Sequence, residues 1–418
     1  MIALFLTLGL IAPVDSLARW EAIAPVAPPP VFEWLDEGNT EELLALSPKK
    51  LRSALEKGRK LVRTQPVEEK RKLRDEFDRN TDLFVVIPPK PRGVLFLLHG
   101  LGGNGRQLID HYKPWAAERG LIIAAPTAKR PPNAAKNEDW TEASGNLPHW
   151  WSYQPGGFVL SALKQLKRQY PIDEDHVFLS GYSMGGFGTW NLGLRYPDRF
   201  AALVPMAGGV SQREYFGGED HDLRKILANA INTPIYFIHG DRDGTVEVEY
   251  DRRSARQLKE LDYDHTYVEV PGGGHVLDVR KGSRLMLGIQ KWAEKRKRNP
   301  HPKRVRFHSL GDYMNQSYWV RIDERIEDGP AEVTAQIGKR NKIAVETQNV
   351  KKLTIFLDEE HIKLSRTVSV VVDGKQKHKG KVKASSEVLL ESWHAREDRK
   401  LLYGAKVEID LAKSDDSD

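Results

Sequence analysis

The stretch "LSGYSMGGFGTW", residues 179–190, places Ser183 between two glycines, Gly181 and Gly185. The residues before it, "HVFLSG", are typical of a buried strand, and those after it, "GGFGTWNLGLRY", are typical of a helix. A sharp strand-to-helix turn strains its central residue and leaves no room for side chains two positions away on either side. The two glycines meet that requirement. The pattern therefore predicts that Ser183 lies on a tight turn at the carboxyl end of a strand, with its hydroxyl exposed.

Short runs rich in Val, Ile, Leu and Phe recur between residues 81 and 296, and helix-like segments such as 158–170 and 250–261 separate most of them. Continuous apolar strands that alternate with helices indicate a mostly parallel sheet with helices on both faces. We therefore predict an α/β domain over 81–296. Ligand sites of such sheets gather at the carboxyl ends of the strands, where the turn with Ser183 is also expected.

The sequence pattern changes on both sides of this domain. Short segments of mostly alternating polarity over 310–412 predict a small, all-β, sandwich-like C-terminal domain. The proline-broken basic stretch 297–309 is predicted as a linker, and residues 413–418 as a polar tail. Residues 19–80 are predicted as an N-terminal helical and linker segment.

The chain of 418 residues contains no cysteine, which excludes a cysteine nucleophile, disulfide bonds and thiolate metal sites. An apolar run at 2–14 precedes small residues, so residues 1–18 are predicted as a signal peptide and the protein as secreted or periplasmic. The alternative is a buried or membrane-anchoring N-terminal segment. No later stretch is apolar and long enough to span a bilayer, and we expect no stable membrane span in the mature chain.

The net charge of +6 is concentrated in residues 291–418, which hold 27 Lys and Arg against 21 Asp and Glu. This part opens with the basic run 291–307, interpreted as a solvated helix end and linker. Contact with a polyanion or a membrane surface is the alternative. No nucleic-acid partner is expected.

A serine nucleophile needs a general base, and the base needs a carboxylate to orient it. In a sheet of this topology the acid and then the histidine follow the serine along the chain. The strand in "IYFIHGDRDGTV" (235–246) ends in a loop with Asp241 and Asp243, and the strand in "YVEVPGGGH" (267–275) ends in a glycine-rich loop with His275. His275 is the candidate base. Asp243 is preferred as the acid because it lies further into its loop, whereas Asp241 is better placed to cap the turn.

The negative charge that develops on an attacked carbonyl needs backbone N–H donors. The first candidate is the N–H of Met184, which directly follows the serine. The second is expected from the glycine-rich loop "HGLGGNG" (99–105), with Leu101 as the preferred donor and Gly102 as the alternative.

Five other aromatic side chains near the predicted strand ends have structural as well as functional interpretations. His99 and His239 each precede a glycine, and we expect them to brace loops by hydrogen bonds. Trp140, Trp150 and Trp151 belong to a long insertion after the strand "LIIAAP". They either pin this loop to the body or form an aromatic wall for an acyl group or sugar. Trp151 is the candidate substrate contact.

Four segments, "HGLGGNG", "LSGYSMGGFGTWNLGLRYPDRFAALVPMAGG", "FIHGDRDGTV" and "PGGGH", together resemble the α/β-hydrolase superfamily over about residues 80–296. Within it they are most similar to secreted feruloyl/acetylxylan esterases, polyhydroxybutyrate depolymerases and prolyl-oligopeptidase-type "predicted peptidases". No metal or organic cofactor is expected to be needed. The resemblance implies roles for five residues: Ser183 as nucleophile, Asp243 as acid, His275 as base, and Leu101 and Met184 as oxyanion donors. Glu247 stands where the family frequently has proline.

The predicted function is that of a serine carboxylester hydrolase. It would act through an acyl-enzyme on small or polysaccharide-linked esters with aromatic or short acyl groups. One alternative is a serine peptidase for short peptides. Another is a glycan- or surface-binding protein with a secondary hydrolase unit, in which the β domain contacts a glycan. The β domain could equally pack on the catalytic domain.

Overall fold

The computed structural model describes residues 30–57, 66–75, 78–129, 150, 153–210, 223–311 and 314–412. The predicted signal peptide and polar tail lie outside the described residues and stay predictions, and Trp140 and Trp151 also lie outside them. Within the described ranges, no helix has both the length and the apolar character needed to cross a membrane.

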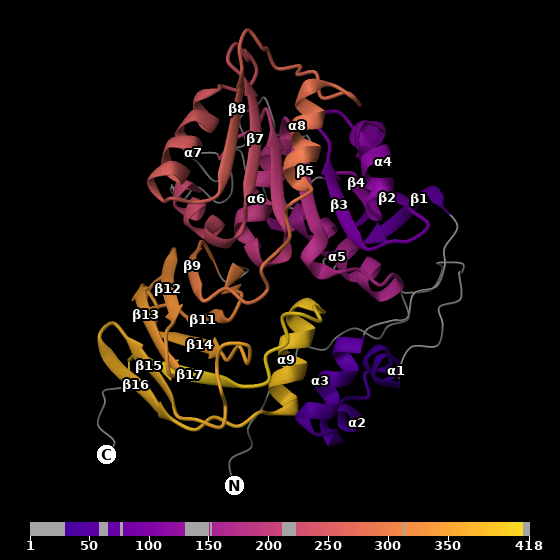
Figure 1. Ribbon diagram of the computed structural model, residues 1–418. Helices are drawn as coiled ribbons and strands as arrows, with labels where there is room; N and C mark the ends of the chain where they lie inside the picture. The colour runs from indigo at the N-terminus through magenta and orange to yellow at the C-terminus, as the bar shows by residue number, and fades with distance from the viewer. Residues whose placement is uncertain are drawn as a thin grey trace.

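An eight-stranded mixed sheet forms the upper part of the molecule in Figure 1, in the strand order β1-β2-β4-β3-β5-β6-β7-β8. Strands β3 to β8 run parallel, and β1 and β2 pair antiparallel at one edge. The inner strands are buried on both faces, which explains their continuous apolar sequences. The strands are β1 (Val67–Arg74), β2 (Asn80–Ile87), β3 (Gly93–Leu98), β4 (Leu121–Pro126), β5 (Val177–Tyr182), β6 (Ala202–Met206), β7 (Ile235–Gly240) and β8 (His265–Val270).

Helices cover both faces of this sheet, as the alternation of strands and helices predicts. Two of them, α4 and α8, share one apolar cluster with one face, and α5, α6 and α7 contribute to the cluster on the other face. The helices are α4 (Ile109–Glu118), α5 (Tyr153–Gln169), α6 (Met184–Arg195), α7 (Glu249–Glu260) and α8 (Arg284–Ala293), with 3-10 helices η1 (Gly105–Leu108), η2 (Glu174–His176), η3 (Pro197–Arg199) and η4 (Leu223–Asn232).

The C-terminal part contains two further sheets, ordered β16-β15-β13-β12-β9 and β10-β11-β14-β17. Apolar side chains of both sheets belong to one core, as expected for a sandwich, and an α-helix, α9 (Ser386–Arg396), lies between β16 and β17 in the chain. The strands are β9 (Arg304–Ser309), β10 (Gln316–Ser317), β11 (Val320–Glu324), β12 (Ala331–Ile337), β13 (Lys342–Gln348), β14 (Lys352–Phe356), β15 (Val368–Val372), β16 (Lys375–Gly380) and β17 (Lys406–Asp410).

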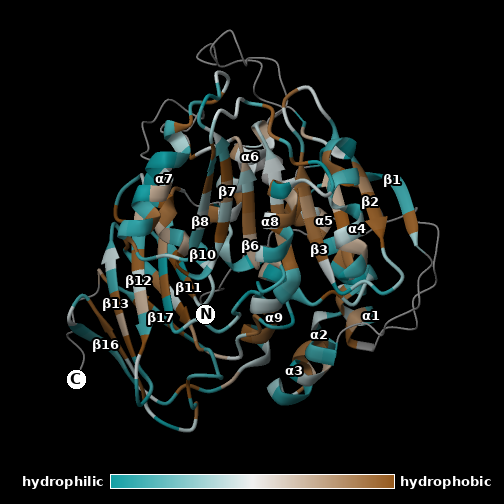
Figure 2. Cartoon of the chain, turned by 45° about the horizontal axis from the view of Figure 1, so that its top comes forward, coloured by the Kyte–Doolittle hydropathy of each residue, from teal (hydrophilic) through white to brown (hydrophobic). Residues whose placement is uncertain are grey.

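Two strands lie where the sequence predicted none. Strand β1, "VEEKRKLR", falls within the predicted helical and linker segment 19–80. It is the edge strand of the large sheet, so water rather than core faces most of its charged side chains. Figure 2 colours much of this strand teal, for hydrophilic residues. Strand β9 falls within the predicted linker 297–309. Its arginines alternate with Val305 and Phe307, which are buried. In both strands, charge conceals the apolar period.

Three short helices open the described chain: α1 (Pro30–Glu37), α2 (Thr40–Ala45) and α3 (Pro48–Lys57). They lie beside α9, more than 300 residues later in sequence (Figure 1). Leu51 and Leu55 share a small core there with Leu389 and Trp393. The N-terminal segment therefore belongs structurally with the C-terminal β domain.

The β domain packs on the catalytic domain through buried charges. Arg298, taken from the sequence as part of a solvated basic run, is only 1% exposed. Its guanidinium donates to Asp398 at 2.6 and 3.1 Å and to Asp175 at 3.1 Å. Beside it, Arg396 of α9 pairs with Asp198 of η3 at 2.6 Å. We call these residues the charged seam.

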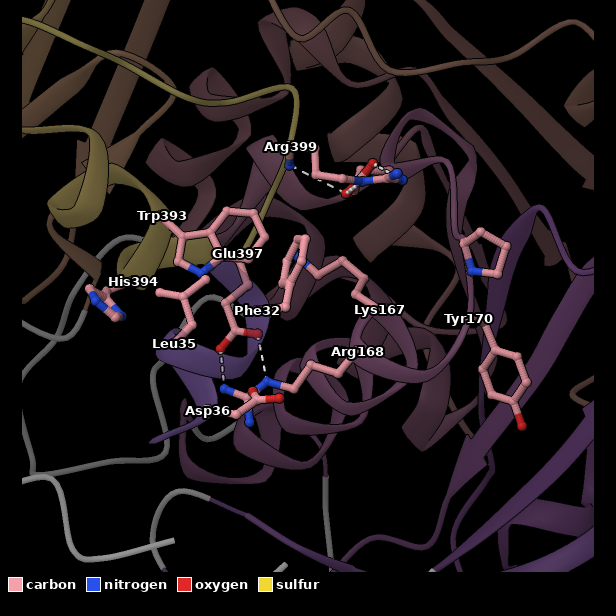
Figure 3. A pocket seen from close by; sticks show the side chains of 12 residues that line it. Phe32, Leu35, Asp36, Lys167, Arg168, Tyr170, Trp393, His394, Glu397 and Arg399 are labelled. Carbon is pink, nitrogen blue, oxygen red and sulfur yellow. Dashed lines mark hydrogen bonds and ion pairs between the residues drawn. The ribbon is translucent and has the colours of Figure 1, made fainter. Parts of the chain in front are cut away.

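Further ion pairs join α5 and η2 to the end of α9, around a cavity of about 50 Å³ (Figure 3). Arg168 donates to both carboxylate oxygens of Glu397 at 2.8 and 2.6 Å, and Arg399 pairs with Glu174 at 2.8 Å. Burial lowers the pKa of Lys167 to about 8, and its ammonium donates to the carbonyl of Arg396 at 2.6 Å. These charges are matched to one another, so they stabilise the contact between the domains.

Candidate active site

Ser183 lies at the turn from β5 into α6, where it has φ 57° and ψ −118°. A positive φ is costly for a residue with a side chain and persists only where the surroundings enforce it. Here the Ser183 N–H donates to the carbonyl of Met206 on β6 at 2.8 Å, which fixes the turn to the sheet. The hydroxyl does not cap α6. It therefore remains available to groups above the sheet.

The glycines on either side of Ser183 are required by packing, as the sequence predicted. A Cβ added at Gly185 would lie 1.9 Å from the carbonyl oxygen of Leu98, and one at Gly181 would lie 2.2 Å from that of Gly185. Real Cβ atoms do not approach backbone this closely. The turn can therefore contact β3 only with glycine at position 185, and it can fold back on its own strand only with glycine at position 181.

The structure brings Ser183, His275 and Asp243 together from three strand ends. His275 lies in the loop between β8 and α8, and its Nε2 is 2.9 Å from Ser183 Oγ. Its Nδ1 is 2.7 Å from Oδ2 of Asp243, in the loop between β7 and α7. Asp241 is not part of this relay, and its Oδ1 is buried without a hydrogen-bond partner among the described residues.

The Asp243 carboxylate is held in its ionised form. Its side chain is fully buried, which alone would raise its pKa. The N–H groups of Val246 and Thr245 donate to Oδ1 at 2.9 and 2.8 Å, and together with His275 they outweigh burial and lower the pKa of Asp243. A negative charge therefore faces Nδ1 of His275, which keeps the Nδ1–H tautomer and leaves Nε2 free to accept a proton.

The two candidate oxyanion donors belong to segments next to Ser183, one in sequence and one in space. Met184 begins α6, whose first N–H groups have no partners within the helix. The loop after β3 also approaches the serine, since a Cβ added at Gly100 would lie 3.6 Å from Ser183 Cβ. Leu101 follows Gly100 in this loop, and its side chain is 55% exposed.

Tyr182, directly before the serine, makes contacts that the sequence did not predict. Its hydroxyl donates to the carbonyl of His275 and accepts from the N–H of Leu277 at 2.8 Å. Its ring meets that of His275 edge-on, with centroids 6.0 Å apart. The residue beside the serine thus clamps the histidine loop. A tyrosine at a strand end carries no sequence signal for such a contact.

His99, His239 and Trp150 belong to the interior. Nδ1 of His99 lies 2.7 Å from the carbonyl of Gly100, and its Nε2 accepts from the N–H of Ala128 at 2.9 Å. Trp150 is fully buried, donates to the carbonyl of His99 at 3.0 Å and packs edge-on against its ring. Trp150 is therefore an interior side chain and is not part of an aromatic wall. Within the described residues, no three His, Asp or Glu side chains are grouped so that they could hold a metal ion.

The sequence model of the Phospholipase/Carboxylesterase family matches residues 81–293, about half of the chain. The bifunctional acetylxylan esterase/xylanase XynS20E of Neocallimastix patriciarum is 26% identical over 173 residues, which are 40% of this chain and 22% of that protein. A probable feruloyl esterase C of Aspergillus niger is 24% identical over 176 residues, covering 40% of this chain and 56% of the relative.

The chain thus spans only part of the length of these relatives. A solved structure of an S-formylglutathione hydrolase from Agrobacterium tumefaciens is 19% identical, with a TM-score of 0.45 over 55% of this chain and 95% of the other. The family match contains all three residues of the relay, and it extends from β2 to the end of α8. The chain belongs to the Phospholipase/Carboxylesterase family.

Proposed function

We propose that the protein is a serine carboxylester hydrolase with Ser183 as nucleophile, His275 as general base and Asp243 as the acid that orients it. The observation that carries the proposal is the continuous relay of 2.7 and 2.9 Å contacts from Asp243 through His275 to Ser183. The strained backbone of Ser183 supports it, since strain of this kind gathers at functional sites.

The reaction follows from the relay. His275 Nε2 takes the hydroxyl proton while Ser183 Oγ attacks the ester carbonyl, and the N–H groups of Met184 and Leu101 stabilise the resulting oxyanion. His275 then gives the proton to the departing alcohol, leaving an acyl-serine. Water, deprotonated by the same histidine, then attacks the acyl carbon. The bond from that carbon to Ser183 Oγ breaks, His275 returns the proton to Oγ, and the acid is released. Each backbone donor is expected to lower the barrier by about 3 kcal/mol.

Esters of carbohydrates or of aromatic and short-chain acids are the proposed substrates. The support comes from the names of the relatives, an acetylxylan esterase and a feruloyl esterase. The side chain of His275 is 22% exposed, which is compatible with a bulky ester that approaches from solvent.

Labelling by a fluorophosphonate probe, together with hydrolysis of p-nitrophenyl acetate, tests the proposal. The wild-type protein should be labelled and active, and Ser183→Ala should lose the label and about 10⁴-fold or more in kcat/KM. Ser180→Ala is the matched control. Ser180 lies on β5, three residues before Ser183, but it is fully buried and hydrogen-bonded to Tyr112 and to the carbonyl of Val204. Its loss should therefore leave labelling intact. An unlabelled, inert wild type would overturn the proposal.

A substrate panel tests the acyl and alcohol preference. It contains an acetylated sugar, a feruloyl ester, a short aliphatic ester, a polyester and the anilide that matches one of the esters. Sugar and feruloyl esters are expected to react fastest. Faster cleavage of the anilide than of its ester would instead identify a peptidase.

A further inference from the structure

His239 lies between two aspartates in the interior, one of which is the acid of the relay. It is the penultimate residue of β7, and its side chain is fully buried. Nδ1 is 2.8 Å from Oδ2 of Asp251 on α7. Nε2 is 3.0 Å from the carbonyl oxygen of Val246 and 3.3 Å from Oδ2 of Asp243. The same carboxylate oxygen of Asp243 therefore faces both His239 and His275.

The protons of this group can be assigned from its partners. A carbonyl oxygen only accepts hydrogen bonds, so Nε2 of His239 must carry a proton. One more proton is shared between Nδ1 and Asp251. Burial raises the pKa of Asp251 to about 6; burial lowers that of His239, but its hydrogen bond to Asp251 outweighs this and leaves the pKa raised. The N–H of Trp190, which donates to Oδ1 of Asp251, and the place of Asp251 in the first turn of α7 both favour its carboxylate form. We therefore assign the shared proton to His239, the member of the pair beside Asp243.

The contacts close into a ring that begins and ends on α6. Oδ1 of Asp251 accepts from the indole N–H of Trp190 at 3.1 Å, and Trp190 is fully buried in α6. Ser183 directly precedes α6 and lies about two helical turns before Trp190. Asp251 itself lies in the first turn of α7, where the helix dipole favours a negative charge. Nucleophile helix, α7, acid loop and histidine loop are therefore linked by one set of buried polar contacts.

Another charged cluster near His239 lies on β8 and is neutralised separately. Glu269 accepts from Arg252 at 2.9 and 2.7 Å and from the hydroxyl of Tyr267 at 2.8 Å. The charge of Glu269 is thus matched by Arg252.

We propose that His239, charged through its pairing with Asp251, is a positioning residue that holds the carboxylate of Asp243 in place and limits how strongly it stabilises a protonated His275. This inference rests on the proposed function, since it assigns a partner to the acid of that relay. His239 touches no reacting atom and acts only through Asp243. Two consequences follow, one for the position of the Asp243 carboxylate and one for the proton affinity of His275.

Asp251→Asn tests the effect on proton affinity. An asparagine amide can donate to Nδ1 of a neutral His239, so the contact remains while the positive charge beside Asp243 is lost. Removing a nearby positive charge favours the imidazolium of His275. The midpoint of its titration, followed by NMR with labelled histidine, should rise by roughly half a pH unit. The acidic limb of kcat/KM should move in the same direction.

His239→Asn and His239→Gln test the effect on geometry. Glutamine can place an N–H near the position of Nε2, whereas asparagine is too short to do so. The kcat for p-nitrophenyl acetate should fall roughly 10- to 100-fold in the asparagine variant, with little change in KM, and should be partly restored in the glutamine variant. Circular dichroism and thermal melts identify the variants that remain folded. If the His239 variants do not fold, the titration of His275 in Asp251→Asn still tests the role of His239.

Asp358→Asn is the matched control, because Asp358 is also buried and pairs with Nδ1 of a histidine, His301, at 3.0 Å in the β domain. It should cost stability without moving the His275 midpoint. An unchanged midpoint in folded Asp251→Asn, or an equal shift in the control, overturns the role of His239. The titration needs no substrate, so an inert wild type would reject only the ester hydrolase proposal.

Discussion

The hydroxyl of Tyr182 links the turn with Ser183 to the histidine loop, through the carbonyl of His275 and the N–H of Leu277. Tyr182→Phe keeps the ring and removes this clamp. We expect kcat for p-nitrophenyl acetate to fall about tenfold, because a typical buried hydrogen bond is worth about 1 kcal/mol and here it sets the position of the base. The control is Tyr112→Phe, which removes a buried hydroxyl bonded to Ser180 and should change stability but not kcat. Equal rates in both variants would contradict the prediction.

Single residues were predictable from sequence where their order along the chain carries information. Ser183, Asp243 and His275 each follow a recognisable strand, and the topology of the sheet brings those strand ends to one edge. Asp243 could be preferred over Asp241 only by its distance from the strand. The contacts of Tyr182 and His239 were not predictable, since the direction of a side chain at a strand end depends on its tertiary neighbours.

At the scale of elements, β5, its turn and α6 form a unit that depends on close contact with β3. Gly185→Ala would place a Cβ 1.9 Å from the carbonyl oxygen of Leu98, and backbone cannot yield as a flexible side chain can. We expect a loss of about 3 kcal/mol in the free energy of unfolding, together with loss of fluorophosphonate labelling. Gly380→Ala is the control, because a Cβ there meets only the His378 ring at 3.6 Å. Urea unfolding that ranks the two variants equally would refute this account of the turn.

Strands with a clear apolar pattern were predictable, and strands whose sequences are rich in charged residues were missed. The inner strands of the large sheet are apolar throughout, and β12 matches its alternating sequence residue for residue. Strands β1 and β16 are edge strands: β1 is rich in lysine, arginine and glutamate, and half of the residues of β16 are lysine. The backbone pairing of such strands leaves little trace in the hydrophobic pattern. Helix α9 was hidden for a related reason, because it contacts apolar groups from α1 to α3 that lie far away in sequence.

At the scale of the whole molecule, the charged seam makes the two domains depend on each other. Arg298→Ala leaves Asp398 buried without its main cation and leaves Asp175 paired only with Lys400, and we expect a loss of about 3 kcal/mol in the free energy of unfolding. Arg256→Ala, which removes an exposed pair with Glu249, should cost less than about 1 kcal/mol. Urea unfolding measures both. A near-neutral effect of Arg298→Ala would mean that the seam only aligns the domains.

The seam also predicts the response to acid. Burial alone would raise the pKa values of Asp198 and Asp398, but Arg396 and Arg298 outweigh it and hold both below the ordinary value of 3.8. A carboxyl group with a lowered pKa stabilises the folded state above its unfolded-state pKa, and this contribution is lost as the pH falls toward the lower folded-state value. The melting temperature should therefore fall from about pH 5 downward. The fall should be shallower in Arg298→Ala, because Asp398 has lost its main cation. Parallel curves would contradict this explanation.

The charged edge strands have a consequence for how copies of this chain meet at high concentration. A strand at the end of a sheet exposes backbone groups that another strand could pair with, which is the usual route to intermolecular β-sheet and fibrils. Strand β1 ends the large sheet with "VEEKRKLR" and β16 ends one sandwich sheet with "KQKHKG". A second copy docking in register would stack like charges at successive positions. The charged side chains that made these strands hard to predict from hydrophobic pattern thus also oppose self-assembly through the sheet edges.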